Sequence, residues 1–303
     1  MPVLAVNHHY FRDTGPGKGI YPITPVALRQ QVSLVRKKWR MGDESDVVRF
    51  SHGEMSPNDY VCIFTFDDGL KEQLSAIRLL GDQGATAICF VPTAAIIQRT
   101  VLNVHKLHLI RSVRSDEELS IQLSKRFDFE SYEFDDELLA VQYRYDKPIS
   151  RRVKYFLNFV LEKLEQDMWI SELFIDIFGT ESAVSEKLYM NVDELNYLAK
   201  RNILGTHAHT HVPLSTLSAQ KCEAEIEVSV GTLQDLTNYK VKGISYPFGG
   251  KSAVSDMVFS LSKKLGLDYG FTMERGINLN QGFNPLALKR IDTNDLKQWI
   301  NEQ

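Results

Sequence analysis

The sequence of 303 residues has few cysteines, no basic excess and no long apolar run. Its three cysteines, Cys62, Cys89 and Cys222, are odd in number and far apart, which argues against a disulfide framework and favours reduced, structural thiols. The net charge of -4 and the pI near 6.1 leave no electrostatic footprint for nucleic acid. We therefore expect no nucleic acid partner.

Signals for export or membrane insertion are also missing. No stretch approaches the ~18 apolar residues that a membrane-spanning helix needs. The N-terminal residues MPVLAVNHHYF lack the basic region, the long apolar region and the cleavage site of a signal peptide. We therefore expect a cytoplasmic protein without a membrane span, and its 43% hydrophobic residues are enough for one large core.

Two adjacent carboxylates follow a predicted buried strand. The segment IFTFDDG, residues 63–69, places Asp67 and Asp68 after four apolar or β-branched residues and before Gly69, which permits a tight turn. Parallel α/β folds keep their chemistry at this end of a strand. Neighbouring carboxylates repel each other in a partly buried site unless a cation or a proton compensates. The pair predicts a metal site, although Asp-Asp-Gly is also common in exposed turns.

Three histidines follow a second predicted strand. His207, His209 and His211 lie in GTHAHTH, residues 205–211. On a strand they would alternate, whereas on a helix His207 and His211 would share a face. Neutral imidazoles are good ligands for zinc. Two of them with one carboxylate of the aspartate pair would leave positions open for water and substrate, which is typical of a hydrolytic metal site.

Predicted strands and helices alternate on both sides of a helical segment. Short apolar runs such as residues 3–6 and 86–91 are separated by helical patterns, which favours a parallel sheet with right-handed crossovers. From about residue 99 to 186 the sequence is charged and helical, with a long amphipathic segment at 149–169. We predict one α/β domain over residues 1–303, with a helical insertion at about 99–186.

A third strand end has the turn sequence ISYPFGG, residues 244–250. A proline, an aromatic residue and two glycines can expose a backbone N–H toward a reacting carbonyl oxygen. Taken alone this pattern is weak, because such turns are common.

These three segments, in this order, resemble the first three motifs of the polysaccharide deacetylase family, also called NodB-type or family 4 carbohydrate esterases. The motifs are TFDDG (65–69), GTHAHTHVPLSTL (205–217) and SYPFG (245–249). The resemblance implies a deformed (β/α) barrel of the NodB type. It also implies a metal-dependent hydrolase that acts on a linear amide C–N bond, removing acetate or formate from an amino sugar.

The resemblance assigns a role to each matching residue. Asp67 becomes the catalytic base, and Asp68, His207 and His211 become the metal ligands. The expected metal is Zn²⁺, with Co²⁺, Ni²⁺ or Mn²⁺ as alternatives. Phe248 would contribute its backbone N–H to the oxyanion site.

The family's late motif, which supplies the general acid, is missing. No histidine follows Asp292. Members similar to the poly-N-acetylglucosamine deacetylases carry a tyrosine–histidine pair on an N-terminal strand, and His9 matches that position best. His8 is the second candidate, and His105 or His108 of the insertion would be the alternatives.

The other two motifs also depart from the family pattern. Ala208 replaces the usual serine or threonine, and His209 is an extra imidazole with no family role. The arginine that usually orients the base is absent from the third motif. We expect Arg290, at the end of a late strand, to reach that carboxylate, with Arg275 as a second choice.

The expected function is N-deacetylation of a nucleotide-, lipid- or glycan-linked amino sugar in surface polysaccharide biosynthesis, such as that of O-antigen or lipopolysaccharide. Two alternatives remain open. The chain could be an amidase on a non-sugar acyl amide, or a degenerate barrel that binds carbohydrate without catalysis. The intact set of two aspartates and two histidines argues against the degenerate barrel.

Overall fold

The computed structural model describes residues 2–14, 19–56, 58–279 and 282–302. The chain divides into two compact units. The first, here called the sheet unit, comprises Met1–Gly15, Pro22–Thr100 and Ser182–Gln303. The second, the helical unit, comprises Pro16–Tyr21 and Val101–Glu181.

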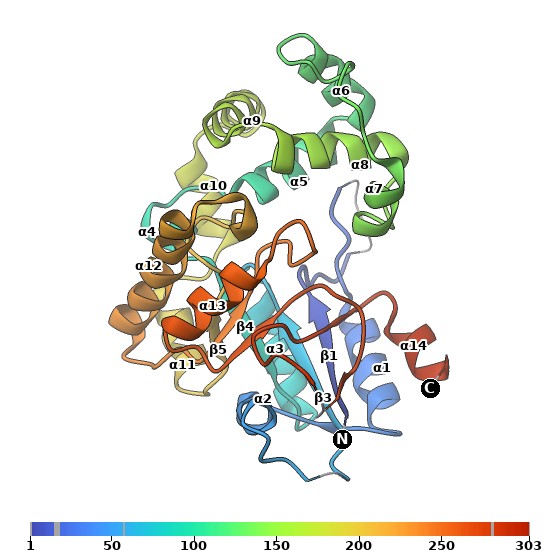
Figure 1. Cartoon of the computed structure of the whole chain (residues 1–303), viewed down its shortest axis with the longest axis vertical. Coiled ribbons are helices and arrows are strands. Elements are labelled where there is room, and N and C mark those ends of the chain that lie inside the picture. The colour runs from blue at the N-terminus through green and yellow to red at the C-terminus, as the bar shows by residue number, and fades with distance from the viewer. Residues whose placement is uncertain (1, 15–18, 57, 280–281, 303) are drawn as a thin grey trace. The chain divides into compact units, whose positions relative to one another are not determined.

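The sheet unit is built on one curled, mostly parallel sheet (Figure 1). Its strands are β1 (Pro2–His8), β2 (Arg40–Met41), β3 (Val61–Phe66), β4 (Ala87–Val91), β5 (Leu204–Thr206), β6 (Gly243–Ser245), β7 (Tyr269–Phe271), β8 (Asn278–Leu279) and β9 (Ile291–Asp292). The order is β7-β6-β5-β4-β3-β1-β8, with β2 paired to β3 and β9 to β1. Only the β1–β8 pairing is antiparallel among these described pairs. The carboxyl ends of the parallel strands therefore meet at one edge.

Helices pack around this sheet. They are α1 (Pro25–Val35), α2 (Glu44–Ser51), α3 (Gln73–Asp82), α4 (Ala94–Ile97), α11 (Val192–Ala199), α12 (Ala219–Thr237), α13 (Asp256–Lys264) and α14 (Leu296–Glu302), and α10 (Glu181–Leu188) begins at the unit boundary. Two of the helices begin at residues that favour a helix start. Thr24 caps α1 ahead of Pro25, and Asn191 forms a capping box with Glu194 at α11.

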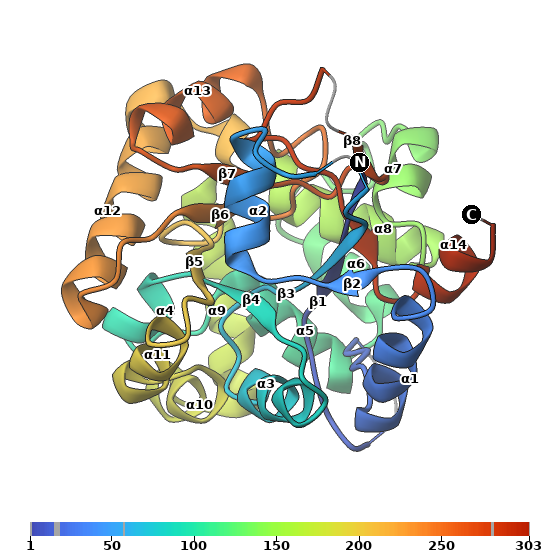
Figure 2. The same ribbon diagram turned by 90° about the horizontal axis from the view of Figure 1, so that it is seen from below.

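Strand alternation gives the sheet two apolar faces. On β3, Val61 and Ile63 lie in the smaller core cluster with Val47 and Phe50 of α2, while Phe64 lies in the larger cluster. Figure 2 shows α2 within the arc formed by β7 through β1. Helix α2 therefore fills the concave side of the curled sheet, and the other helices cover the convex side. This arrangement is a deformed (β/α) barrel, as predicted.

The helical unit contains α5 (Asn103–Val113), α6 (Asp116–Ser124), α7 (Asp136–Gln142), α8 (Pro148–Tyr155), a π-helix (Phe156–Val160) and α9 (Lys163–Phe178). The prediction of one amphipathic segment over 149–169 is wrong. The segment breaks at Leu161, whose backbone is extended at φ -68° and ψ 140° and whose N–H closes the π-turn on Phe156. Because the break changes the helical phase, Leu164 is exposed rather than part of a continuous apolar face. None of the described helices is both long and apolar enough to cross a membrane.

Candidate metal centre

The carboxyl edge of the sheet brings the first two sequence segments together. The N–H of Asp67, just after β3, donates to the carbonyl of His8 on β1 at 3.0 Å. The N–H of His207, just after β5, donates to the carbonyl of Val91 on β4 at 3.0 Å. Since β3 and β4 are neighbours, the aspartate pair and the histidine segment lie at the same edge.

Three buried side chains form a potential ligand set. The Nε2 atoms of His207 and His211 lie 3.4 and 3.3 Å from Oδ1 of Asp68. One ligand atom from each of the three lies within 4.8 Å of the others. One carboxylate and two imidazoles with their ligand atoms turned toward each other suit zinc and similar divalent ions. The residues present therefore fit a metal.

A hydrogen bond at Nδ1 fixes the orientation of the His207 ring. Its Nδ1 lies 2.6 Å from the carbonyl oxygen of Ser245, which can only accept a hydrogen bond. The proton must then be on Nδ1, so that Nε2 of a neutral ring is available to a metal. Burial lowers the pKa of His207, but Asp67, Asp68 and the Ser245 carbonyl outweigh it and raise the pKa above 6.5. The negative charges of Asp67 and Asp68 would also favour a cation beside the ring.

Backbone strain is concentrated at the site. Asp68, Ala208, His211 and Phe248 have φ of 83°, 58°, 57° and 61°. Left-handed conformations of residues other than glycine cost about 1–3 kcal/mol each and persist where the surroundings enforce them, often at functional sites. The segment from His207 to His211 is neither a strand nor a helix but an irregular turn. This turn brings its two outer histidines together, with their ring centroids 4.8 Å apart.

Two glycines are required by close approaches at the edge. A Cβ on Gly69 would lie 2.9 Å from Cγ1 of Val91, and one on Gly249 would lie 2.8 Å from the N of Met273. Both glycines also have positive φ, 64° and 56°. Larger residues would push apart the strand ends that carry the site.

Asp67 has different partners from Asp68. Nη1 of Arg290 lies 2.9 Å from its Oδ2, and the Ser245 hydroxyl donates to the same oxygen at 3.0 Å. Arg290 is 1% exposed and donates further to the Asn7 side-chain carbonyl at 2.9 Å. The guanidinium thus balances the charge of Asp67 and fixes its orientation.

The alternative arginine lies elsewhere. Arg275 pairs with Asp295 at 3.0 Å and its guanidinium lies over the Trp299 ring. It is not among the groups that contact Asp67. Arg290 alone of the two candidate arginines therefore reaches the carboxylate.

The two N-terminal histidines face different surroundings. His8 is fully buried, with Nδ1 3.1 Å from the Thr65 carbonyl and Nε2 3.0 Å from Oε1 of Gln31, and its ring stacks on Phe66. Burial lowers its pKa. His8 is therefore a packed core residue, whereas His9 is half-buried beyond the end of β1.

The remaining candidates are placed as follows. His105 and His108 lie on α5 of the helical unit, with ring centroids 6.1 Å apart. The ring of Phe248 lies 5.1 Å from that of His211. The Gly249 N–H donates to the Pro247 carbonyl at 2.7 Å, which closes a γ-turn around Phe248.

The sequence reasoning missed Ser245 and Asn7 as parts of the site. Ser245 contacts both Asp67 and His207, and Asn7 contacts Arg290. A signal was present for Ser245, because it lies in the SYPFG motif from which the usual arginine is absent. Asn7 could be found only through strand alternation, as the polar residue two positions before His9.

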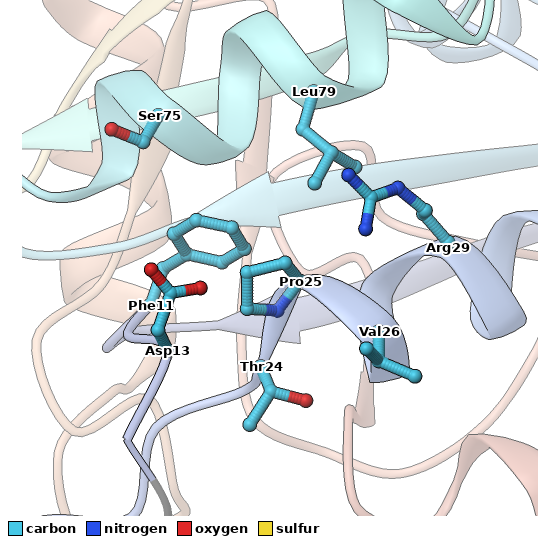
Figure 3. Close-up of a pocket in the computed structure, with 8 residues that line it drawn as sticks. All are labelled: Phe11, Asp13, Thr24, Pro25, Val26, Arg29, Ser75 and Leu79. Atoms are coloured by element: carbon cyan, nitrogen blue, oxygen red, sulfur yellow. The ribbon is translucent and has the colours of Figure 1, made fainter.

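A surface pocket of the sheet unit lies apart from these residues. It lies between α1 and α3, with Asp13 and Arg29 on opposite sides (Figure 3). Its lining residues are Phe11, Asp13, Thr24, Pro25, Val26, Arg29, Ser75 and Leu79. None of the candidate site residues is among them.

Comparison with known proteins gives one family match and several similar structures. The sequence model described as polysaccharide deacetylase matches residues 177–270, a stretch that includes His207, His211 and Phe248 but not the aspartate pair. No curated protein matches the sequence.

The similar solved structures share the fold over nearly the whole chain. The deacetylase PplD of Streptococcus pyogenes, in complex with acetate, is 14% identical, with 98% of this chain and 97% of that chain covered and a TM-score of 0.59. IcaB from Ammonifex degensii is 10% identical, with 99% and 96% covered and a TM-score of 0.61. The BpsB deacetylase domain from Bordetella bronchiseptica is 13% identical, with 96% and 95% covered and a TM-score of 0.56. These likenesses confirm the predicted fold.

Proposed function

We propose that this chain, whose residues 177–270 match the sequence model of the polysaccharide deacetylase family, is a member of that family and a metal-dependent N-deacetylase of an amino sugar. The observation that carries the proposal is the buried ligand set Asp68, His207 and His211 beside a separately held Asp67. The ligand set and the base have different partners, as a division between metal binding and proton transfer requires.

Asp68, His207 and His211 would hold a divalent metal, with Zn²⁺ expected first. A metal bound there would lower the pKa of a water molecule toward neutrality and polarise the substrate carbonyl. The rest of the chemistry belongs to the protein's own side chains.

Asp67 is proposed as the general base. It takes a proton as water attacks the acetamide carbonyl carbon, and Arg290 and Ser245 keep its carboxylate oriented for this transfer. A charge-assisted bond from a fully buried guanidinium limits the rotation of the carboxylate. Because the carboxylate is already oriented, the base needs no further ordering when the proton is transferred.

Phe248 and His9 are proposed for the later steps. The Phe248 N–H would donate a hydrogen bond to the oxyanion, and the strained γ-turn around this residue supports a functional role. His9 would then give a proton to the nitrogen as the C–N bond breaks, releasing acetate or formate and a free amine. The position of His9 supports this role, because it follows β1 by one residue and lies two residues after Asn7, which contacts Arg290.

The substrate class is proposed from the family and from the fold. Polysaccharide deacetylases act on acylated amino sugars, and the PplD structure contains acetate, the product of deacetylation. We propose a nucleotide-, lipid- or glycan-linked amino sugar and a role in surface polysaccharide assembly, such as lipopolysaccharide biosynthesis, in the cytoplasm. An amidase acting on a non-sugar amide would use the same residues.

The decisive experiment measures acetate or formate release from a panel of N-acylated amino sugars and sugar nucleotides. Wild-type protein with Zn²⁺ should release the acid from at least one of them, and the Asp67→Asn variant should not. Release only from non-sugar amides would favour the amidase. Failure with every amide despite bound metal would favour a non-catalytic barrel.

A further inference from the structure

His209, the histidine without a metal role, points away from the ligand set. Its Nδ1 lies 2.8 Å from Oγ1 of Thr93, which follows β4. Its carbonyl oxygen accepts a hydrogen bond from the N–H of Ala94 at 2.9 Å. His209 thus ties the histidine turn to the segment between β4 and α4.

Glu225 of α12 holds the same turn from the other side. Its Oε2 accepts from the N–H groups of His209 at 3.1 Å and Thr210 at 2.8 Å. Its Oε1 accepts from the Thr210 hydroxyl at 2.7 Å. Glu225 thus satisfies two backbone N–H groups and one hydroxyl of the turn, and hydrogen bonds to a carboxylate are stronger than those between neutral groups.

These contacts act where the backbone is strained. Ala208 has φ 58°, and its carbonyl accepts from the Ser229 hydroxyl of α12 at 2.8 Å. A left-handed residue persists only when its surroundings enforce it. If the anchors on α12 and after β4 were lost, the turn could relax, and His207 and His211 would no longer face Asp68 together.

We propose that Glu225 and His209 are positioning residues that hold the turn between the two histidine ligands in its metal-binding shape. This inference rests on the proposed metal-dependent function. Neither residue belongs to the ligand set Asp68, His207 and His211. Both would orient His207 and His211 through the backbone of the turn, as outer-shell partners orient metal ligands in other proteins.

The first test uses Co²⁺ as the probe, because its visible absorption reports ligand geometry. Metal-free Glu225→Gln should bind Co²⁺ about 10- to 100-fold more weakly than wild type, the range for outer-shell changes, with a changed visible spectrum. The matched control is Glu227→Gln, an identical change at an exposed position of the same helix, which should bind like wild type. Wild-type affinity and spectrum in Glu225→Gln would overturn the proposal.

The second test separates anchoring from ligation at His209. In His209→Asn the amide can replace Nδ1 in the bond to Thr93, whereas His209→Leu has similar size and no polar atom. We expect Co²⁺ affinity near wild type in the asparagine variant and a loss of about 10-fold or more in the leucine variant. Equal, complete loss of Co²⁺ in both would make His209 a ligand and contradict its anchoring role.

A milder variant covers the case in which Glu225→Gln does not fold. Thr210→Val removes only the hydroxyl bond to Glu225 and should weaken Co²⁺ binding by a smaller factor, with the melting temperature of the metal-free protein near wild type. Unchanged Co²⁺ binding in both Thr210→Val and His209→Leu would also overturn the proposal. Failure of the proposed function looks different. Wild type would then bind Co²⁺ normally and Glu225→Gln would bind it more weakly, but wild type would release no acid from any amide.

Discussion

The sheet unit buries acidic groups at both ends of its strands, and the two ends differ in kind. At the carboxyl edge, Asp67 and Asp68 are both 2% exposed. At the amino end, Glu44 of α2 is 1% exposed, beside Lys242 just before β6 and Tyr269 at the start of β7. Burial of a carboxylate alone therefore does not mark an active site.

The partners of these acids separate structure from chemistry. Glu44 accepts hydrogen bonds from the hydroxyls of Tyr239 and Tyr269, with Lys242 at 3.6 Å, and none of these residues has a positive φ. Burial raises the pKa of Glu44, and these partners offset the rise only in part. Asp68 instead faces two imidazoles on a strained backbone. Strain combined with converging ligand atoms is the better functional signal.

Among the variants that test this contrast between the two ends of the strands, His9→Ala, at the carboxyl edge, should lower the rate most. If His9 protonates the leaving nitrogen, the rate should fall by about 10²–10⁴, the usual contribution of general acid catalysis, with metal content unchanged. Because the acid must be protonated to act, the alkaline limb of the pH–rate profile should disappear. Rates across pH and metal analysis of the purified variant check this.

His8→Ala is the matched control for that experiment. Its ring packs on Phe66 and bonds to Gln31, so its loss should lower the melting temperature with a much smaller effect on the rate. A damaged rate in His8→Ala together with normal activity in His9→Ala would contradict the assignment. If both variants are active, the acid comes from elsewhere, with His105 and His108 as the next candidates.

A smaller loss is expected from Arg290→Lys. Lysine keeps the positive charge but cannot bond Asp67, Ser245 and Asn7 at once. Misplacement of the base should lower kcat by about 10²-fold with metal content unchanged. Steady-state kinetics measure this, with Arg275→Lys as the control of the same chemistry. Equal kcat in wild type and Arg290→Lys would show that Arg290 does not position the base.

The smallest effect on activity is expected at the amino end, from Glu44→Gln. Since the folded-state pKa of Glu44 is raised above 4.5, its effect on stability is most favourable below that pH and is lost as pH rises toward the folded-state pKa. The glutamine variant lacks this dependence. Its melting temperature relative to wild type should therefore increase with pH, while kcat stays unchanged. A clear loss of kcat would place Glu44 in the catalytic machinery and end the contrast between the two ends.

Local chemistry made much of the sheet unit predictable. Thr24-Pro25 and the Asn191 capping box identify helix starts, and short apolar runs before Asp67 and His207 identify parallel strand ends. Strand ends of a parallel sheet meet at one edge, so sequence alone could bring the aspartates and histidines together. The turn conformation of the histidine segment was not predictable, because its hydrogen-bond partners lie on other elements: Glu225 on α12, and Thr93, more than a hundred residues earlier, after β4.

Long-range contacts account for the rest of what the sequence left open. The choice between Arg290 and Arg275 depends on the packing of a late strand against β1, which no local pattern encodes. No proline or glycine lies near Leu161, so the local sequence does not predict the break there. In both cases tertiary packing, rather than local preference, decides the outcome.

Metal stoichiometry in two aspartate variants tests the central claim most directly. Asp68→Ala removes a proposed ligand and should retain almost no metal after purification, whereas Asp67→Asn and wild type should both keep about one ion per chain, and Asp67→Asn should lose turnover. The amide preserves the shape of the base and its contact with Arg290 but cannot take a proton. Equal loss of metal in the two variants would contradict the division between a metal-binding Asp68 and a proton-accepting Asp67.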